Sequence, residues 1–188
     1  ALVEAVNQDF GCRCPTETRF VELVSLVEVI KYHVKNVRKW MKPERRSMPV
    51  NMRPAKAKII RQPLGVVGII VPWNYPYLLL FLDLLPALIA GNTAVIKPSE
   101  VTPFTAEWGV GLMHEVGVPA DVVQIVHGRG ATGAELIEHV DFVAFTGSTA
   151  TGRKVAQRAA ERLVPYSMEL GGKDPALALA DANLDITA

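Results

Sequence analysis

The chain has 188 residues, of which 49% are hydrophobic and 21% are charged. This composition excludes a disordered chain, and the length allows one domain of ordinary size with a sizeable core. A formal net charge of +1 gives no reason to expect an acidic partner.

Cys12 and Cys14 are the only cysteines of the sequence. A disulfide across one intervening residue is geometrically awkward, and two cysteines do not make a secreted disulfide scaffold. No cluster of histidines, cysteines or carboxylates near them has the spacing of a zinc site. We therefore expect free thiols in a reducing compartment, a cytoplasmic protein and no metal.

Residues 16–41 are predicted to form an amphipathic helix, because apolar residues recur there at spacings of three and four. Pro43 should end this helix, and residues 43–55, with three prolines, indicate an extended connection. Residues 1–55 are thus expected to form an N-terminal helix and connection that pack on the core.

The stretch between Lys31 and Arg61 contains eleven lysines and arginines and one acid, Glu44. A basic patch can bind nucleic acid, but only Tyr32 and Trp40 interleave these charges. A solvated helix face followed by a surface segment explains the pattern better, so no nucleic-acid partner is expected.

Residues 64–82 carry no charge over 19 positions, which is long enough for a membrane span. Pro72 and Pro76 interrupt the run, and Asp83 follows it directly. A buried strand at 66–71, a sharp turn and a buried helix fit better, so we expect no membrane partner.

Strands and helices then alternate along residues 56–188, after an exposed strand at 56–62. The predicted strands are 66–71, 93–97, 122–126, 142–145 and 166–170, and the predicted helices are 77–90, 105–116, 131–139 and 149–162. This alternation predicts an α/β fold with a doubly wound, mostly parallel, Rossmann-like sheet, and residues 56–188 as a dinucleotide-binding domain.

Ligands of such sheets bind beyond the carboxyl ends of the strands. Four segments occupy these positions, and all are rich in groups that suit a dinucleotide: 72–74, 97–100, 127–130 and 146–148.

Two of these segments could hold a phosphate. Residues 128–133 match the pattern G-x-G-x-x-G after a strand, but the acid expected about 20 residues later is missing, so an ordinary glycine turn is an equal alternative. Residues 145–149 lead a strand into a helix through Gly, Ser and Thr, which suits an anion or a simple helix cap.

Three side chains could carry more specific chemistry. Glu100, three residues after Lys97, could accept hydrogen bonds from a ribose, or form only a surface ion pair. Asn74 could stabilise an oxyanion or simply form a turn. Glu169 could act as a general base, although a single carboxylate at a strand end is often structural.

Taken together, the motifs resemble those of aldehyde dehydrogenases over nearly the whole chain. They are Pro-Leu-Gly-Val-Val (63–67), Pro-Trp-Asn-Tyr-Pro (72–76), Gly-Asn-Thr-Ala-Val-Ile-Lys-Pro-Ser-Glu (91–100), Phe-Thr-Gly-Ser (145–148) and Glu-Leu-Gly-Gly-Lys (169–173). The segments at 38–43 and 62–65 look most like the coniferyl-aldehyde and class 3 branch.

The resemblance implies roles for individual residues. Asn74 would be the oxyanion donor and Glu169 the catalytic glutamate that activates the deacylating water. Lys97 and Glu100 would hold the adenosine ribose. The other residues implied in binding NAD, with NADP possible, are Pro72, Trp73, Ser99, Gly128, Phe145, Thr146, Gly147, Ser148, Leu170 and Gly171.

The resemblance also implies an aldehyde substrate, a cysteine thioester intermediate and a homo-oligomer. Only 19 residues follow Glu169 and none is a cysteine, so the chain is expected to be a cofactor-binding fragment that is inactive alone. Two alternatives stay open: a nucleotide-binding module without catalysis, and a relative that transfers the acyl group to CoA. A glutamate at position 169 that activates water disfavours the second.

Overall fold

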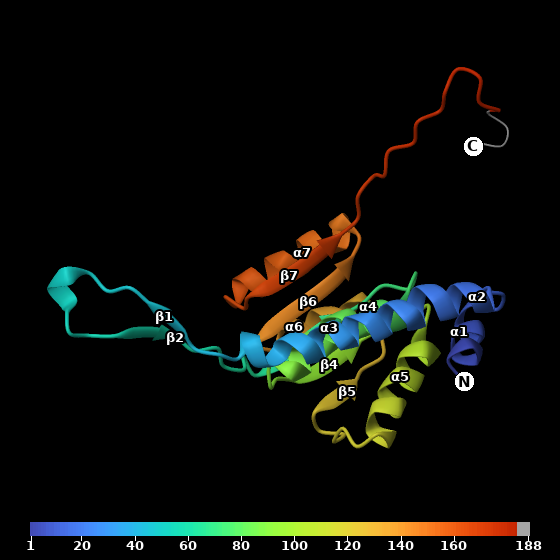
Figure 1. The fold of residues 1–188 in the computed structure, drawn as a ribbon. Helices are drawn as coiled ribbons and strands as arrows, with labels where there is room; N and C mark the ends of the chain where they lie inside the picture. The colour runs from blue at the N-terminus through green and yellow to red at the C-terminus, as the bar shows by residue number, and fades with distance from the viewer. Residues whose placement is uncertain (184–188) are drawn as a thin grey trace.

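In the computed structural model, which describes residues 1–183, a five-stranded parallel sheet forms the centre of the molecule (Figure 1). Its strand order is β5-β4-β3-β6-β7. The strands are β3 (Val66–Ile70), β4 (Thr93–Lys97), β5 (Val123–Ile125), β6 (Phe142–Gly147) and β7 (Tyr166–Leu170). The predicted fold class is confirmed.

The strands are added to the sheet first on one side of β3 and then on the other. From β3 the chain first builds outward through β4 and β5, and it then returns to place β6 and β7 on the other side of β3. In the register, Ile70 lies opposite Lys97 of β4 and opposite Phe145 of β6. The carboxyl ends of β3 and β6 therefore form a topological switch point, where the two halves of the sheet leave a crevice.

Helices cover both faces of the sheet, as the alternation predicts. On one face, α4 (Pro76–Ile89) and α5 (Pro103–Glu115) pack against Val67 and Ile69. On the other face, α6 (Gly130–Ile137) and α7 (Thr149–Glu161) pack around Ile70. Successive residues of β3 thus serve two cores, which is why this strand is apolar without alternation.

The N-terminal region is helical over most of its length, but not as one helix. It contains α1 (Leu2–Phe10), α2 (Pro15–Glu17), a π-helical stretch η1 (Thr18–Val24) and α3 (Ser25–Trp40). The predicted helix at 16–41 is therefore found with a π-helical first part, while α1 was not predicted. α1 contacts α5, and α3 contacts α4.

The apolar stripe of this long helix does not face the core. Its exposed members are Phe20, Leu23, Val24, Val27, Ile30, Val34 and Met41. The buried residues lie on a different face, four residues apart: Thr18, Glu22 and Leu26. Periodicity identifies the helix, but here it does not identify the side that packs on the sheet.

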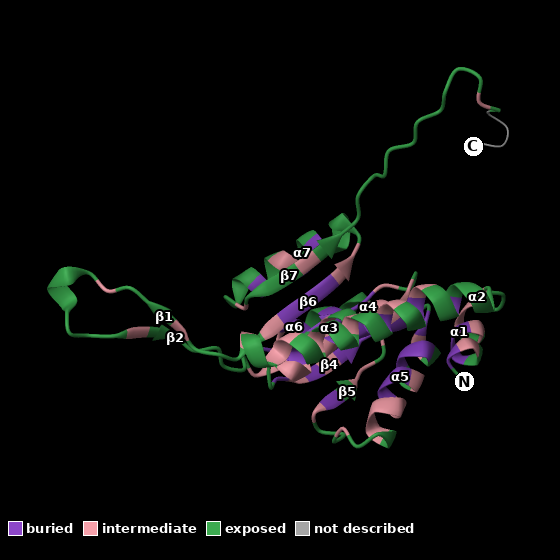
Figure 2. Ribbon diagram, in the orientation of Figure 1, coloured by how far each residue is buried: buried purple, intermediate pink, exposed green. Residues whose placement is uncertain are grey.

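Residues 44–59 form a hairpin that projects away from the body (Figure 1). β1 (Glu44–Arg46) pairs antiparallel with β2 (Ala57–Ile59), and a short 3₁₀ helix, η2 (Val50–Met52), lies between them. The extended connection predicted over 43–55 thus includes a paired strand and a short 3₁₀ helix, which the prediction did not contain; Glu44 lies opposite Ile59, and Arg46 lies opposite Ala57. Figure 2 shows that most of the hairpin is exposed.

After β7 the chain leaves the sheet as an exposed segment (Figure 2). The division into units 1–55 and 56–188 stays a prediction. The last five residues of the second unit, 184–188, lie outside the described residues. Within residues 1–183, no helix is long and apolar enough to cross a bilayer. The apolar run of the sequence is divided between β3 and the 14-residue helix α4.

Candidate functional site

Two adjoining clefts lie at the carboxyl ends of β3, β4 and β6. Both are lined by Pro72 and by the segment Thr146–Gly147–Ser148. We call the cleft over the switch point the switch-point cleft and its neighbour the Asn74 cleft. The strand-end rule applied to the sequence therefore selected residues that the fold brings together.

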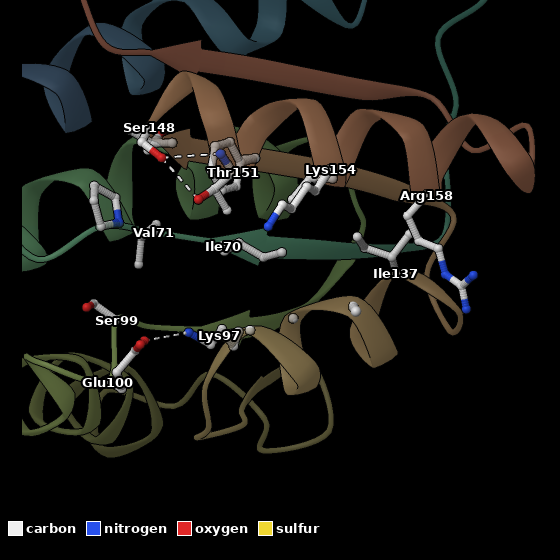
Figure 3. Close-up of a pocket in the computed structure, with 18 residues that line it drawn as sticks. Ile70, Val71, Lys97, Ser99, Glu100, Ile137, Ser148, Thr151, Lys154 and Arg158 are labelled. Atoms are coloured by element: carbon white, nitrogen blue, oxygen red, sulfur yellow. Dashed lines mark hydrogen bonds and ion pairs between the residues drawn. The ribbon is translucent and has the colours of Figure 1, made fainter.

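The switch-point cleft has a volume of about 520 Å³, within the range of small-molecule sites. Lys97, Ser99 and Glu100 lie on one side of it, opposite helix α7 (Figure 3). The lining residues predicted from the sequence are Pro72, Lys97, Ser99, Glu100, Phe145, Thr146, Gly147 and Ser148.

Lys97 and Glu100 form an ion pair at the edge of this cleft. The Lys97 side chain is buried, and its Nζ lies 3.2 Å from a carboxylate oxygen of Glu100. Hydrogen bonding from its own backbone N–H and then from Lys97 lowers the pKa of the Glu100 carboxyl. Glu100 is thus an anion that can accept hydrogen bonds from ribose hydroxyls and that repels a phosphate.

The helix N-termini at this edge of the sheet differ in what they offer an anion. Glu22 accepts hydrogen bonds from the first N–H groups of α4, and Asp9 does so at α5. At α7, Ser148 caps its own helix by accepting from the N–H of Thr151. The two N–H groups before Thr151 have no intrahelical acceptor, so α7 is a better place for a phosphate than α4 or α5.

Helix α7 contributes residues that the strand-end rule missed. Thr151, Lys154, Val155 and Arg158 all line the switch-point cleft (Figure 3). They follow Ser148 at helical spacing, so the amphipathic period of α7 could have identified them. Lys154 adds positive charge to this cleft, whereas Arg158 lies in the last turn of α7 and pairs with Glu138 and Glu161.

Of the G-x-G-x-x-G match, Gly130 and Gly133 line the switch-point cleft, but Gly128 lines neither cleft. Gly128 has φ +151°, and a β-carbon there would lie 1.9 Å from Oγ1 of Thr132. A backbone requirement thus explains this glycine, and its predicted ribose contact stays a prediction.

The Asn74 cleft contains the two residues predicted for the chemical step, Asn74 and Glu169. Three residues predicted to bind the cofactor, Trp73, Leu170 and Gly171, line this cleft as well and not the switch-point cleft. An amide that can donate a hydrogen bond and a carboxylate that can take a proton therefore share one cavity. Such a pair can stabilise negative charge on a carbonyl oxygen and can activate water.

Asp83 of α4 also lines the Asn74 cleft, and the sequence reading did not select it. Burial raises the pKa of the Asp83 carboxyl to about 6, and the negative charge of Glu169 adds to the rise. Helix α4 thus brings a second carboxyl group close to Glu169. The sequence hint was a single acid in an otherwise apolar helix.

Cys12 and Cys14 are exposed and line neither cleft. In the described part of the chain, no group of three or more histidines, cysteines or carboxylates is arranged to hold a metal ion.

A comparison with protein families finds that the aldehyde dehydrogenase family matches residues 6–188. A probable coniferyl aldehyde dehydrogenase of Pseudomonas aeruginosa is 44% identical over 178 residues, which are 94% of this chain and 37% of that protein. A 4,4'-diapolycopene aldehyde oxidase of Methylomonas is 43% identical over 97% of this chain and 35% of its own length.

Solved structures are similar over the same region. A betaine aldehyde dehydrogenase of Staphylococcus aureus, a point mutant in complex with NAD⁺, superimposes with a TM-score of 0.85. It is 33% identical, and the match covers 100% of this chain and 37% of that chain. The present chain thus spans little more than a third of the length of the relatives that it matches.

Proposed function

Because the chain belongs to the aldehyde dehydrogenase family, we propose that the whole protein oxidises an aldehyde to a carboxylic acid with a nicotinamide cofactor. The observation that carries the proposal is the pair of adjoining clefts at the switch point. One suits a dinucleotide, and the other holds an amide donor and a carboxylate. The cofactor and the reacting carbonyl would meet where the clefts join, at Pro72 and Thr146–Ser148.

The residues of the switch-point cleft fit a dinucleotide. The N-terminus of α7, with Gly147 and Ser148, would hold the pyrophosphate. Lys97 and Glu100 would hold the adenosine ribose, and Glu100 favours NAD⁺ over NADP⁺ because its charge repels a 2′-phosphate. When bound, the nicotinamide supplies the acceptor for a hydride from the substrate.

In the Asn74 cleft, the side-chain amide of Asn74 would donate a hydrogen bond to the oxygen of the aldehyde as a thiolate adds to its carbon. Loss of hydride from that carbon leaves a thioester. Glu169 would then take a proton from water as the water attacks the thioester carbon and the thiolate leaves. Cys12 and Cys14 line neither cleft, so neither is placed to supply this thiolate.

We further propose a homo-oligomer, which the projecting, exposed hairpin at 44–59 supports because it offers unpaired strand edges outside the body. The coniferyl-aldehyde relative suggests an aromatic aldehyde as the first substrate to try. A cytoplasmic location is part of the same proposal.

The test is the intact protein with Glu169→Gln, assayed with NAD⁺ and benzaldehyde. We expect NADH to form at the normal rate in the first turnover. Release of the acid in the steady state should then be slow, because thioester hydrolysis has lost its base. A drop of about 10²- to 10⁴-fold in the steady state is the usual size of such an effect. Glu115→Gln is the matched control, since Glu115 is exposed at the far end of α5.

Unimpaired hydrolysis in Glu169→Gln would remove this residue from the mechanism. Formation of acyl-CoA when CoA is added to the wild-type protein would favour the acyl-transferring alternative. Calorimetry of the chain itself with NAD⁺ tests the cofactor site separately, and the absence of saturable heat would contradict it.

A further inference from the structure

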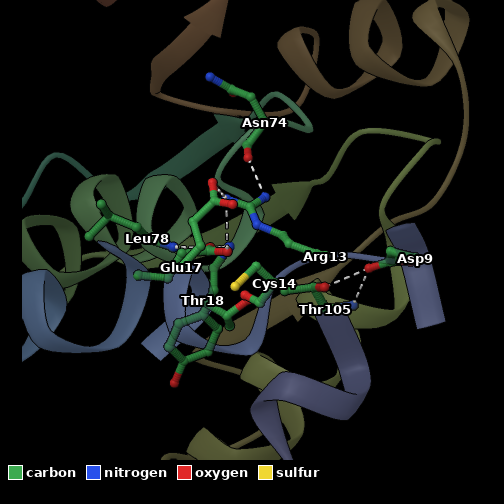
Figure 4. A network of polar contacts seen from close by, with 10 residues as sticks. Asp9, Arg13, Cys14, Glu17, Thr18, Asn74, Leu78 and Thr105 are labelled. Carbon is green, nitrogen blue, oxygen red and sulfur yellow. Dashed lines mark hydrogen bonds and ion pairs between the residues drawn. The ribbon is translucent and has the colours of Figure 1, made fainter. Parts of the chain in front are cut away.

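Arg13 reaches from the N-terminal region into the turn that carries Asn74 (Figure 4). Its Nη1 donates a hydrogen bond of 2.6 Å to the backbone carbonyl of Asn74, 61 positions along the chain. The side chain of Asn74 points away from Arg13 in this view. The contact therefore fixes the backbone and leaves the amide free for the cleft that it lines.

The guanidinium of Arg13 lies close to two aromatic rings. Its central carbon lies 4.8 Å from the ring centroid of Phe10 and 4.8 Å from that of Tyr75. Tyr75 follows Asn74 directly, so the Arg13 side chain contacts two adjacent residues of the turn. Only 6% of the Arg13 side chain is exposed, which strengthens both contacts because water does not compete for them.

Glu22 fixes the other end of the same turn. It is fully buried, and one oxygen accepts hydrogen bonds from the N–H groups of Tyr77, at 2.8 Å, and Leu78, at 3.2 Å. Its other oxygen lies 3.7 Å from Nη2 of Arg13 and has no hydrogen-bond partner within the described residues. The ion pair thus connects Arg13, which contacts Asn74 and Tyr75, to Glu22, which binds the first N–H groups of α4.

The turn has little else to hold it. Tyr75, the N-cap of α4, makes no capping hydrogen bond with its side chain in the described part of the chain. Trp73 is 54% exposed, and its ring centroid lies 6.4 Å from that of Phe10. An oxyanion donor must be held in place before the reaction, because reorganising it would cost much of its effect.

We propose that Arg13, paired with Glu22, is a positioning residue that holds the Asn74 turn in the geometry needed for oxyanion stabilisation. The inference rests on the proposed role of Asn74. It assigns the N-terminal helical region a part in the chemical step, although Arg13 lies outside both clefts.

The main variant is Arg13→Lys in the intact protein, because lysine keeps a positive charge beside buried Glu22 and should leave the fold intact. A lysine lacks the planar guanidinium that can donate to the carbonyl and contact both rings at the same time. We expect kcat with NAD⁺ and benzaldehyde to fall about 10- to 100-fold, as a small misplacement of a catalytic group does. The Kd of NAD⁺ should change less than about twofold, since the switch-point cleft is untouched.

A double-mutant cycle separates positioning from a general structural effect. Asn74→Ala should lower kcat about 10²- to 10³-fold. In the double variant, Arg13→Lys should lower kcat by a further factor of less than about two, because the side chain that it positions is absent. Arg19→Lys is the matched control, since Arg19 lies in the same region and is exposed.

The outcomes distinguish the two proposals. Full activity of Asn74→Ala would overturn the proposed function and this inference with it. Loss of activity in Asn74→Ala but not in Arg13→Lys would overturn only the role of Arg13. Losses that multiply in the double variant would also overturn it, because they would show a structural effect that does not pass through Asn74.

Discussion

Two strand-to-helix connections border the clefts, and they are stabilised in opposite ways. The connection from β6 to α7 is capped locally, by Ser148 on the N–H of Thr151. The connection from β3 to α4 is capped by Glu22, 55 positions before Tyr77. The local cap leaves helix N–H groups free for a ligand, whereas the remote carboxylate occupies them. This contrast supports the proposed pyrophosphate site at α7 and the proposed oxyanion donor just before α4.

The largest expected effect comes from removing the remote cap. Glu22→Ala leaves two helix N–H groups without an acceptor and leaves Arg13 with Glu17 as its only partner of opposite charge among the described residues, which should cost about 3–5 kcal/mol of stability. Urea unfolding of the purified chain measures this free energy. Glu28→Ala is the control, because Glu28 pairs with Lys31 on the exposed face of α3, and it should change stability by at most about 0.5 kcal/mol.

If Glu22→Ala cost no more than a local cap, the contrast between the two connections would disappear. Glu22→Gln should fall between the wild type and Glu22→Ala, since an amide oxygen can still accept from Tyr77.

The α4 side should also respond to pH through Asp83. The pKa of this carboxyl is about 6 in the folded chain and 3.8 in the unfolded chain, so the folded state binds the proton more tightly. Stability should therefore fall as pH rises from about 4 to about 6, with the full loss present above that range.

Asp83→Asn removes this dependence, and we expect it to stabilise the chain by about 1–3 kcal/mol at pH 8 and hardly at all below pH 4. Thermal unfolding at both pH values is the measurement. An equal gain at both would show that the effect of the substitution is not electrostatic.

The smallest expected effect is on the local cap. Ser148→Ala removes one hydrogen bond to the N–H of Thr151 and should cost about 1 kcal/mol. Ser148→Asn should restore most of this, because asparagine is also a good N-cap. Urea unfolding again gives the value, and a cost above that of Glu22→Ala would reverse the order of the two connections.

Much of the fold could be predicted from the sequence. β4 and β7 have the predicted bounds, 93–97 and 166–170, and the sheet helices begin and end within two residues of prediction. The reason is that the signals used for prediction are local: apolar runs mark the buried strands and helices, and turn residues mark where they begin and end. The family predicted from the motifs is also the one that matches.

Other parts of the fold could not be predicted. Helix α1 was missed because its buried residues, Leu2, Ala5 and Val6, make only a short pattern. The pairing of β1 with β2 was missed because it depends on a partner strand rather than on local preference. The candidate site was predicted at strand ends, but Asp83 and Lys154 reach the clefts from helices.

The sequence by itself determined the alternation of strands and helices, the family, and the strand-end segments that line the two clefts. These properties depend on the pattern and spacing of residues that are close in the sequence. Only the tertiary structure decided which face of the long N-terminal helix is buried and what caps α4 and α5. The contacts of Arg13, Glu22 and Asp9 join residues 55 to 96 positions apart. Such contacts form because folding brings backbone groups that lack a local partner next to the side chains of distant residues, and no short-range sequence pattern predicts which residues will meet.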